Sequence, residues 1–154
     1  MVVLKDFRFR VEASPLPRRR VRLASSGKAP LEAAAPPEFR GGTPGMWSPE
    51  DFLVASVASC FVLTFDSTAL QRSLGPYRLA VEAAGHVARR AEGRLGFVVI
   101  ELLVDLTVEP GDTENAERVA RAAKQSCIVG HALAIPIELE LRVRSDEPQL
   151  AAVT

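Results

Sequence analysis

The chain has 154 residues, of which 47% are apolar and 25% charged, a composition typical of one globular domain covering residues 1–154. Its 19 basic and 19 acidic residues cancel, so no charge excess points to a nucleic acid or a membrane surface as partner. We see no signal-peptide pattern, and the longest apolar stretch, residues 52–65, is shorter than the ~20 residues that span a bilayer. We therefore expect a soluble, cytoplasmic protein whose 2 cysteines are too few for a disulfide scaffold.

The first 47 residues are expected to form short strands and a loop. Apolar and charged residues alternate over residues 3–12, which predicts a half-buried strand that Ser14 to Pro17 should break. A second strand at residues 20–23 is expected to close a hairpin. Residues 26–47 are rich in Pro, Gly and Ala, which predicts a loop with one short strand around Leu31.

A long helix is predicted from Ser48 to about Leu74, because serine caps helix starts and Pro49 suits the first helical position. Its apolar residues leave no wide polar side in the first half: Phe52, Val54, Val57, Cys60, Phe61, Leu63 and Leu70. Such a helix should be buried on all sides. A chain of this size with one curved sheet cannot provide that cover, so we expect an obligate dimer with this helix at its centre.

The second half alternates strands with one more helix. A strand over residues 79–87, a turn at residues 90–94 and a long strand over residues 96–108 are predicted. A helix should start near Gly111–Thr113 and place Cys127 on its core side, with Gly130 ending or bending it. A last strand follows over residues 135–144. This order indicates an α+β fold with largely antiparallel sheets.

Cys60 and Cys127 are the candidate reactive residues. A thiol in the middle of an apolar helix has a raised pKa, so the simpler interpretation of Cys60 is an inert core residue. A reactive Cys60 would need a cation, which Arg40 could supply, with Glu50 holding Arg40 as a bidentate pair. On spacing alone, a solvated Arg40 and a helix-capping Glu50 remain the simpler interpretation.

Three further patterns leave alternatives open. A zinc site from Cys60, Cys127, His86 and His131 is less favoured, because structural zinc sites usually contain closely spaced ligand pairs. Met46 and Trp47 either line a pocket or shield the start of the helix. The run of arginines at residues 18–20 is a phosphate-binding patch or, in the favoured interpretation, a solvated turn.

The segment from Phe39 to Phe61 resembles the signature of the OsmC/Ohr superfamily of osmotically inducible proteins and organic hydroperoxide reductases. That pattern has an arginine, then Asn/Ser-Pro-Glu opening a helix, then a run of small residues ending in Cys-Phe. Arg40, Glu50 and Cys60 stand at equal intervals, as in the OsmC branch. A second family motif, Ala-x-x-x-Cys-x-Val, is matched by Ala123, Cys127 and Val129.

The resemblance implies antiparallel sheets packed around two central helices in an intertwined homodimer, with active sites at the interface. It implies a thiol peroxidase of oxidative or osmotic stress defence that reduces organic hydroperoxides, with hydrogen peroxide as a further substrate. Cys60 would be the peroxidatic thiolate, Arg40 its activator and Glu50 the residue that positions Arg40. Cys127 would resolve the oxidised Cys60 as a disulfide, and an external lipoyl-type dithiol would reduce it. No metal or prosthetic group is implied.

The chain departs from the family pattern in two places. Ile128 and Gly130-His131 replace the Pro and the Ser-Asn or Ser-Arg of many relatives, and Met46-Trp47 replaces Gly-Thr. In the Ohr branch the arginine lies near the first hairpin, so Arg18, Arg19 or Arg20 is an alternative to Arg40. Two other functions stay open. One is non-catalytic binding of a small apolar ligand near Met46, Trp47 and Phe61; the other is redox sensing by a structural dimer.

Overall fold

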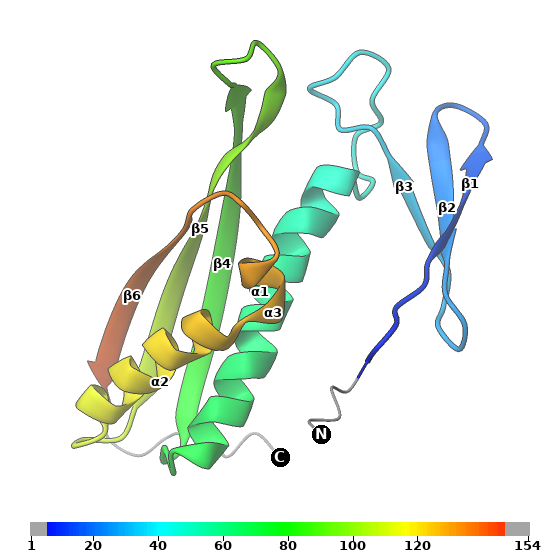
Figure 1. Ribbon diagram of the computed structural model, residues 1–154. Coiled ribbons are helices and arrows are strands. Elements are labelled where there is room, and N and C mark those ends of the chain that lie inside the picture. Colours follow the sequence, from blue (N-terminus) through cyan, green and yellow to red (C-terminus); the bar gives the residue numbers. More distant parts are fainter. Residues whose placement is uncertain (1–5, 147–154) are drawn as a thin grey trace. The chain divides into compact units, whose positions relative to one another are not determined.

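The computed structural model describes residues 6–146 and divides into two compact units, Met1–Phe52 and Leu53–Thr154. Each unit has its own 3-stranded sheet, β1-β2-β3 in the first and β4-β5-β6 in the second (Figure 1). The helix α1 (Pro49–Gln71) begins in the first unit and continues through the second. The predicted α+β class is confirmed.

The first unit is an antiparallel meander of β1 (Glu12–Leu16), β2 (Arg20–Ala24) and β3 (Leu31–Ala34). The turn between β1 and β2 places Arg18 and Arg19 in left-handed backbone conformations, with φ of 61° and 55°. Such conformations cost a non-glycine residue about 1–2 kcal/mol each. The short strand expected around Leu31 is confirmed as β3.

The predicted strand at residues 3–12 is wrong where the structure describes it. Residues 6–11 form no strand, and the side chains of Phe7 and Phe9 are 72% and 91% exposed, while Val3 lies outside the described residues. The strand instead starts at Glu12 and includes Ser14 and Pro15, which we expected to break it. Pairing with β2 across the turn selects this segment, and Pro15 is tolerated because β1 is an edge strand.

The start of α1 follows from its sequence. The Ser48 hydroxyl oxygen accepts a hydrogen bond from the Asp51 backbone N–H at 3.1 Å, and the Ser48 backbone N–H donates to Asp51 Oδ2 at 2.8 Å. This reciprocal capping box fixes the first turn, with Pro49 in the first helical position. The helix ends at Gln71, slightly before the predicted end near Leu74.

In the second unit, β4 (Tyr77–Arg89) and β5 (Leu95–Val108) form an antiparallel hairpin. The Arg90 backbone N–H donates to the Arg94 carbonyl at 2.8 Å, which closes the predicted turn. The last strand, β6 (Ile137–Ser145), lies parallel to β5 because α2 (Thr113–Ser126) and α3 (Ile128–His131) form a crossover between them. The sheet is therefore mixed.

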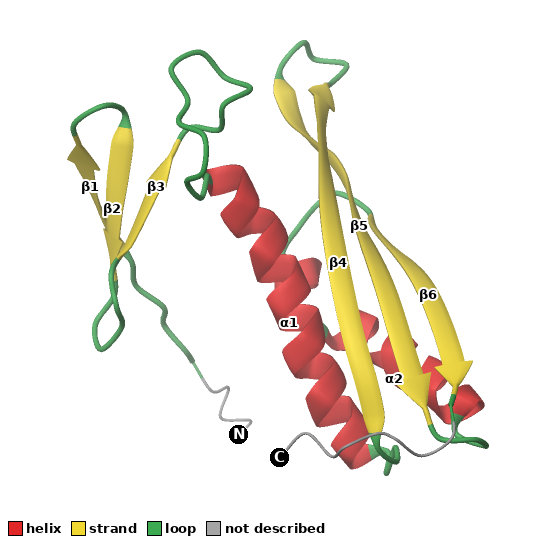
Figure 2. Ribbon diagram, turned by 180° about the vertical axis from the view of Figure 1, so that it is seen from behind, coloured by secondary structure: helices red, strands yellow, loops and turns green. Residues whose placement is uncertain are grey.

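The core of this unit lies between the sheet and the helices. Figures 1 and 2 show α1 and α2 on the same face of the β4-β5-β6 sheet. Alternate residues of β5 face them and are fully buried: Ile100, Leu102, Val104, Leu106 and Val108. The helices contribute Val57, Phe61, Phe65 and Ala69 from α1, and Ala116, Val119, Ala120 and Ala123 from α2.

Within the chain, α1 is buried along one stripe only, as expected for a helix that a single chain of this size cannot cover on all sides. The side chains of Leu63 and Leu70 are 70% and 83% exposed. This 23-residue helix is long and apolar enough to cross a membrane by length and composition alone. The core helix of a soluble protein passes the same test. An aliphatic surface of this kind needs cover, and a partner subunit stays the predicted source of it.

The prediction that Cys127 lies inside the second helix is wrong. The helix ends at Ser126, and Cys127 has an extended backbone (φ −69°, ψ 107°) before α3 begins. The burial pattern does place Cys127 inside, at 4% exposure, as expected. The spacing of apolar residues predicts which face of a helix is buried, but it does not predict the residue at which the helix ends. No proline or glycine stands at position 127 to mark that end.

Candidate active site

The two cysteines meet in the second unit, although they are far apart in sequence. Cys60 lies on α1 and Cys127 at the junction of α2 and α3, and both are free thiols. Their side chains interact through a hydrogen bond that affects both pKa values. The hydrophobic packing of α1 and α2 on one face of the sheet brings these two positions together.

Cys60 is the more acidic of the two thiols. Burial raises the pKa of Cys60, but hydrogen bonding from the Cys127 thiol, the Val129 amide, the Thr64 hydroxyl and the Ile128 amide lowers it below the ordinary 9.0. Thr64 lies one turn along α1, with its Oγ1 4.0 Å from Cys60 Sγ. A lowered pKa increases the thiolate fraction, and the thiolate is the nucleophile.

Cys127 has the opposite character. Burial raises the pKa of Cys127 and the hydrogen bond with Cys60 raises it further, against a smaller lowering by the Gly130 N–H. That N–H donates to Cys127 Sγ at 3.4 Å. Cys127 therefore holds its proton more tightly than an ordinary thiol, whereas Cys60 beside it holds its proton less tightly.

These neutral donors are what the sequence reasoning missed, since it held that a reactive Cys60 needs a cation. Thr64 could have been found, because residues four apart share a helix face. The amides of Ile128 and Val129 could not, because they become available only where the backbone leaves α2 at Cys127.

Arg40 and Glu50 belong to the first unit. Arg40 is exposed, and its carbonyl oxygen accepts a hydrogen bond from Arg19 Nη1 at 2.5 Å. Glu50 is the second residue of α1, and its Oε2 is buried without a hydrogen-bond partner among the described residues. No ion pair joins Arg40 to Glu50 within residues 6–146. That these two residues act on Cys60 stays a prediction.

The hairpin arginines differ in their surroundings. Arg19 lies against the loop that carries Arg40, since a Cβ atom on Gly41 would stand 2.8 Å from Arg19 Nη1. Arg20 forms an ion pair with Glu32 at 3.4 Å. Arg19 therefore supports the backbone at Arg40 and Gly41.

The three predicted pocket residues lie in different units. Trp47 is 57% exposed and stacks on Phe52, with ring centroids 5.8 Å apart and planes at 4°. This stacking agrees with a role in shielding the helix start. Met46 is half-buried in the same loop. Phe61 is fully buried and lines a cavity in the second unit.

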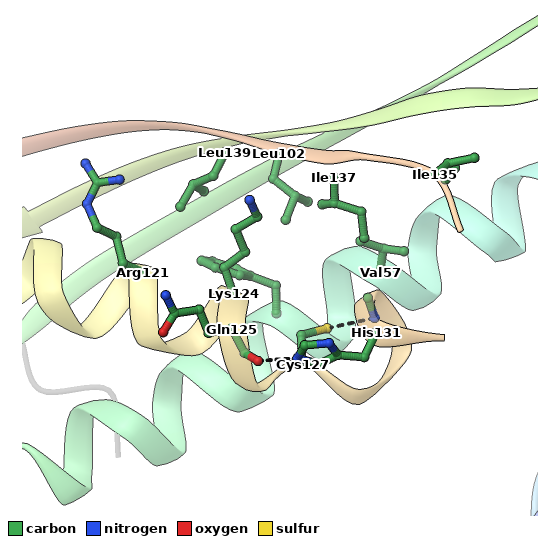
Figure 3. Close-up of a pocket in the computed structure, with 12 residues that line it drawn as sticks. Val57, Leu102, Arg121, Lys124, Gln125, Cys127, His131, Ile135, Ile137 and Leu139 are labelled. Carbon is green, nitrogen blue, oxygen red and sulfur yellow. Dashed lines mark hydrogen bonds between the residues drawn. The ribbon is translucent and has the colours of Figure 1, made fainter. Parts of the chain in front are cut away.

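That cavity has a volume of about 470 Å³ and opens beside Cys127 (Figure 3). One wall is apolar and the other carries cations. Side chains of α1, β5, β6 and the segment just before β6 form the apolar wall: Val57, Phe61, Leu102, Ile135, Ile137 and Leu139. On the other, Arg121 and Lys124 extend from α2 toward the strands, and His131 follows on α3. The sequence alone did not indicate this cavity.

The four residues considered for a zinc site, Cys60, Cys127, His86 and His131, do not form a metal-binding group. Within residues 6–146, no group of three or more His, Cys, Asp and Glu side chains could hold a metal ion. His86 instead pairs with Glu101 at 2.7 Å, and His131 hydrogen-bonds to the carbonyl of Gln125.

Comparison with known proteins gives a consistent family assignment. Residues 42–142 match the family model described as OsmC-like protein. The search of curated proteins finds no match. Among solved structures, an OsmC-like protein of unknown function from Vibrio cholerae has a TM-score of 0.80 at 15% identity, covering 89% of this chain and 100% of that one.

Two further structures show the same fold. An OsmC-like protein from Mycoplasma pneumoniae has a TM-score of 0.77 at 14% identity, with coverage of 90% of this chain and 99% of that one. An organic hydroperoxide resistance protein from Elizabethkingia anophelis has a TM-score of 0.68 at 19% identity, with coverage of 92% and 100%. At these identities the likeness shows the fold alone.

Proposed function

The chain belongs to the OsmC-like protein family, and from that premise we propose that it is a cysteine-based peroxidase that reduces organic hydroperoxides. The observation that carries this proposal is the side-chain contact between Cys60, whose thiol has a lowered pKa, and Cys127, whose thiol has a raised pKa. Some proteins of the same fold are named organic hydroperoxide resistance proteins, which agrees with it.

The proposed reaction begins at Cys60. Its thiolate attacks the distal oxygen of the hydroperoxide, the O–O bond breaks, and the alkoxide leaves as an alcohol after taking up a proton. Cys60 becomes a sulfenic acid. The Cys127 sulfur then attacks the sulfenic sulfur and its proton leaves with the hydroxyl group as water. The product is a Cys60–Cys127 disulfide, two electrons more oxidised than the starting dithiol.

The proposal assigns Arg40 and Glu50 to the activation of Cys60. Glu50 Oε2 is buried and accepts no hydrogen bond from a described residue, so this carboxylate lacks the partner that buried charges need. A guanidinium would supply it and would favour the Cys60 thiolate further. Arg40 is our choice, with Arg19 as the alternative.

The proposed enzyme is a cytoplasmic homodimer that needs no metal or prosthetic group and is regenerated by an external dithiol. The exposed aliphatic side of α1, with Leu63 and Leu70, supports the dimer, because a partner helix could cover it. The active sites would then lie at the interface.

Mass spectrometry of the intact protein tests the function. One equivalent of cumene hydroperoxide should convert the reduced protein to a form lighter by two hydrogen atoms. Cys60→Ser should abolish this change, and Cys127→Ser should accumulate a sulfenic acid that dimedone traps at Cys60. If both thiols stay free while the peroxide persists, the proposal is wrong. Steady-state turnover with a dithiol separates a peroxidase from a redox sensor or a ligand binder.

A further inference from the structure

The cavity beside Cys127 joins an apolar wall to a cationic one. Its volume of about 470 Å³ lies in the range of small-molecule sites. No acidic side chain lines it, and Arg121 and Lys124 form no ion pair with any residue in the described range 6–146. The site therefore suits a ligand with an apolar chain and a negative charge.

The positions of the Cys60 and Cys127 sulfurs indicate whether such a ligand is the peroxide or the reductant. Cys127 lines the cavity, whereas Cys60 does not. A peroxide must reach the sulfur of Cys60, but a molecule in this cavity meets the sulfur of Cys127. The reductant is the substrate that can react there, because it attacks one sulfur of the disulfide.

We propose that this cavity binds the reductant, a thiol compound with an apolar chain and an anionic group, and that thiol–disulfide exchange begins at Cys127 Sγ. The inference rests on the proposed function, since it needs the Cys60–Cys127 disulfide. Arg121 and Lys124 hold the anionic group, and the apolar wall of β5 and β6 packs against the chain.

The exchange is balanced with a dithiol reductant. Its thiolate attacks Cys127 Sγ, the Cys60–Cys127 bond breaks, and Cys60 leaves as a thiolate. The second thiol then attacks the reductant's own sulfur in the mixed disulfide, which forms a cyclic disulfide and releases Cys127. The reductant loses two electrons and two protons, and the two cysteines gain them.

This direction of attack agrees with the acidity of the two cysteines. Thiols of lower pKa leave faster in disulfide exchange. Burial raises the pKa of Cys60, but the hydrogen bonds from Cys127, the Val129 amide and Thr64 lower it overall, which makes Cys60 the better leaving group. Attack on Cys60 would require the less acidic Cys127 to leave.

The first test maps the site of attack. The protein is oxidised to the disulfide with diamide, treated with 6-mercaptohexanoate and quenched with iodoacetamide. Peptide mass spectrometry should find mercaptohexanoate on Cys127 and the alkyl group on Cys60. The reverse distribution would overturn the proposal. Because diamide replaces the peroxide, a failure here is distinct from a failure of the peroxidase reaction.

The second test measures the charge preference with two thiols that differ only at the far end, 6-mercaptohexanoate and 6-mercaptohexanol. The carboxylate should react about three- to tenfold faster at low salt, because two cations attract it. The ratio should fall toward one in Arg121→Gln/Lys124→Gln. Arg118→Gln is the matched control, since Arg118 is on the same helix, pairs with Glu114 at 2.6 Å and does not line the cavity.

Two results would contradict the assignment of the cavity. One is equal reaction of the two thiols with the wild-type disulfide. The other is an Arg121→Gln/Lys124→Gln variant in which the ratio of the two thiol rates is unchanged but Cys60 reacts more slowly with a carboxylate-bearing hydroperoxide. That result would make the cavity a peroxide site.

Discussion

The side chains of Cys60 and Cys127 interact, and this interaction shifts the pKa values of the two thiols in opposite directions. Burial raises the pKa of both thiols, but the hydrogen bond between them lowers the pKa of Cys60 and raises that of Cys127. The contact therefore gives two chemically identical side chains different acidities, with the more acidic thiol on α1 and the less acidic one beside it.

Removing the donor should make Cys60 less acidic. In Cys127→Ala, the pKa of Cys60 is expected to rise, because the side-chain donor is lost while burial remains. Cys127→Ser keeps a hydroxyl donor and should shift the pKa less. The pH dependence of Cys60 alkylation by iodoacetamide measures both. Equal alkylation profiles in the wild type and Cys127→Ala would contradict this role of Cys127.

The cation proposed for Cys60 can be identified by comparing arginines. Arg40→Gln is expected to lower kcat/KM for cumene hydroperoxide by about 10²-fold, the usual cost of losing one charged donor in an active site. Glu50→Gln should lower it less, since Glu50 acts through the arginine. Arg8→Gln serves as the control, because Arg8 is exposed, pairs with Asp6 at 3.2 Å and is not a candidate for the role. A large loss in Arg19→Gln with none in Arg40→Gln would move the role to the first hairpin.

Tyr77 provides a spectroscopic test of the second unit, because it is the only tyrosine of the chain. Burial, followed by the hydrogen bond to Asp66 at 2.6 Å and the charge of Asp66, raises the pKa of Tyr77 from 10.0 to about 12. Absorbance at 295 nm should follow this single ionisation. In Asp66→Asn, the pKa of Tyr77 should fall toward 10.0, because the charge is gone.

The same shift has a consequence for stability. The folded state favours the protonated phenol, so the contribution of Tyr77 is complete below pH 10.0 and is lost as the pH rises through about 12. Denaturant unfolding of the wild type and Tyr77→Phe should show a difference that shrinks over this range. A difference that grows with pH would contradict the assignment.

The exposed side of α1 should be the dimer interface. Leu63→Glu is expected to give monomers, because a carboxylate would be buried without a partner in the interface. Leu95→Glu is the matched control, since Leu95 is 56% exposed on the β4-β5 hairpin. Sedimentation velocity of the three proteins measures the outcome, and a dimeric Leu63→Glu variant would place the interface elsewhere.

The sequence by itself determined the class of the fold and most of its elements. The strong alternation over residues 96–108 and the helical spacing of Ala116, Val119 and Ala123 correctly predicted most of the core, although Val98 of the same alternation is 37% exposed. Periodicity works there because burial imposes it on each element separately. The failures at residues 3–12 and at Cys127 have a different cause, because strand pairing and helix ends depend on what lies opposite each segment.

The sequence also singled out Cys60 and Cys127, but it described Cys60 as inert without a cation. Only the tertiary structure decided that the two sulfurs interact, that Thr64 and two amides next to Cys127 act on Cys60, and that Arg121 and Lys124 line a cavity with Cys127. A pKa depends on a few ångströms of separation between groups that are distant in sequence. No pattern along the chain records such distances, which arise when α1, α2 and the sheet pack together.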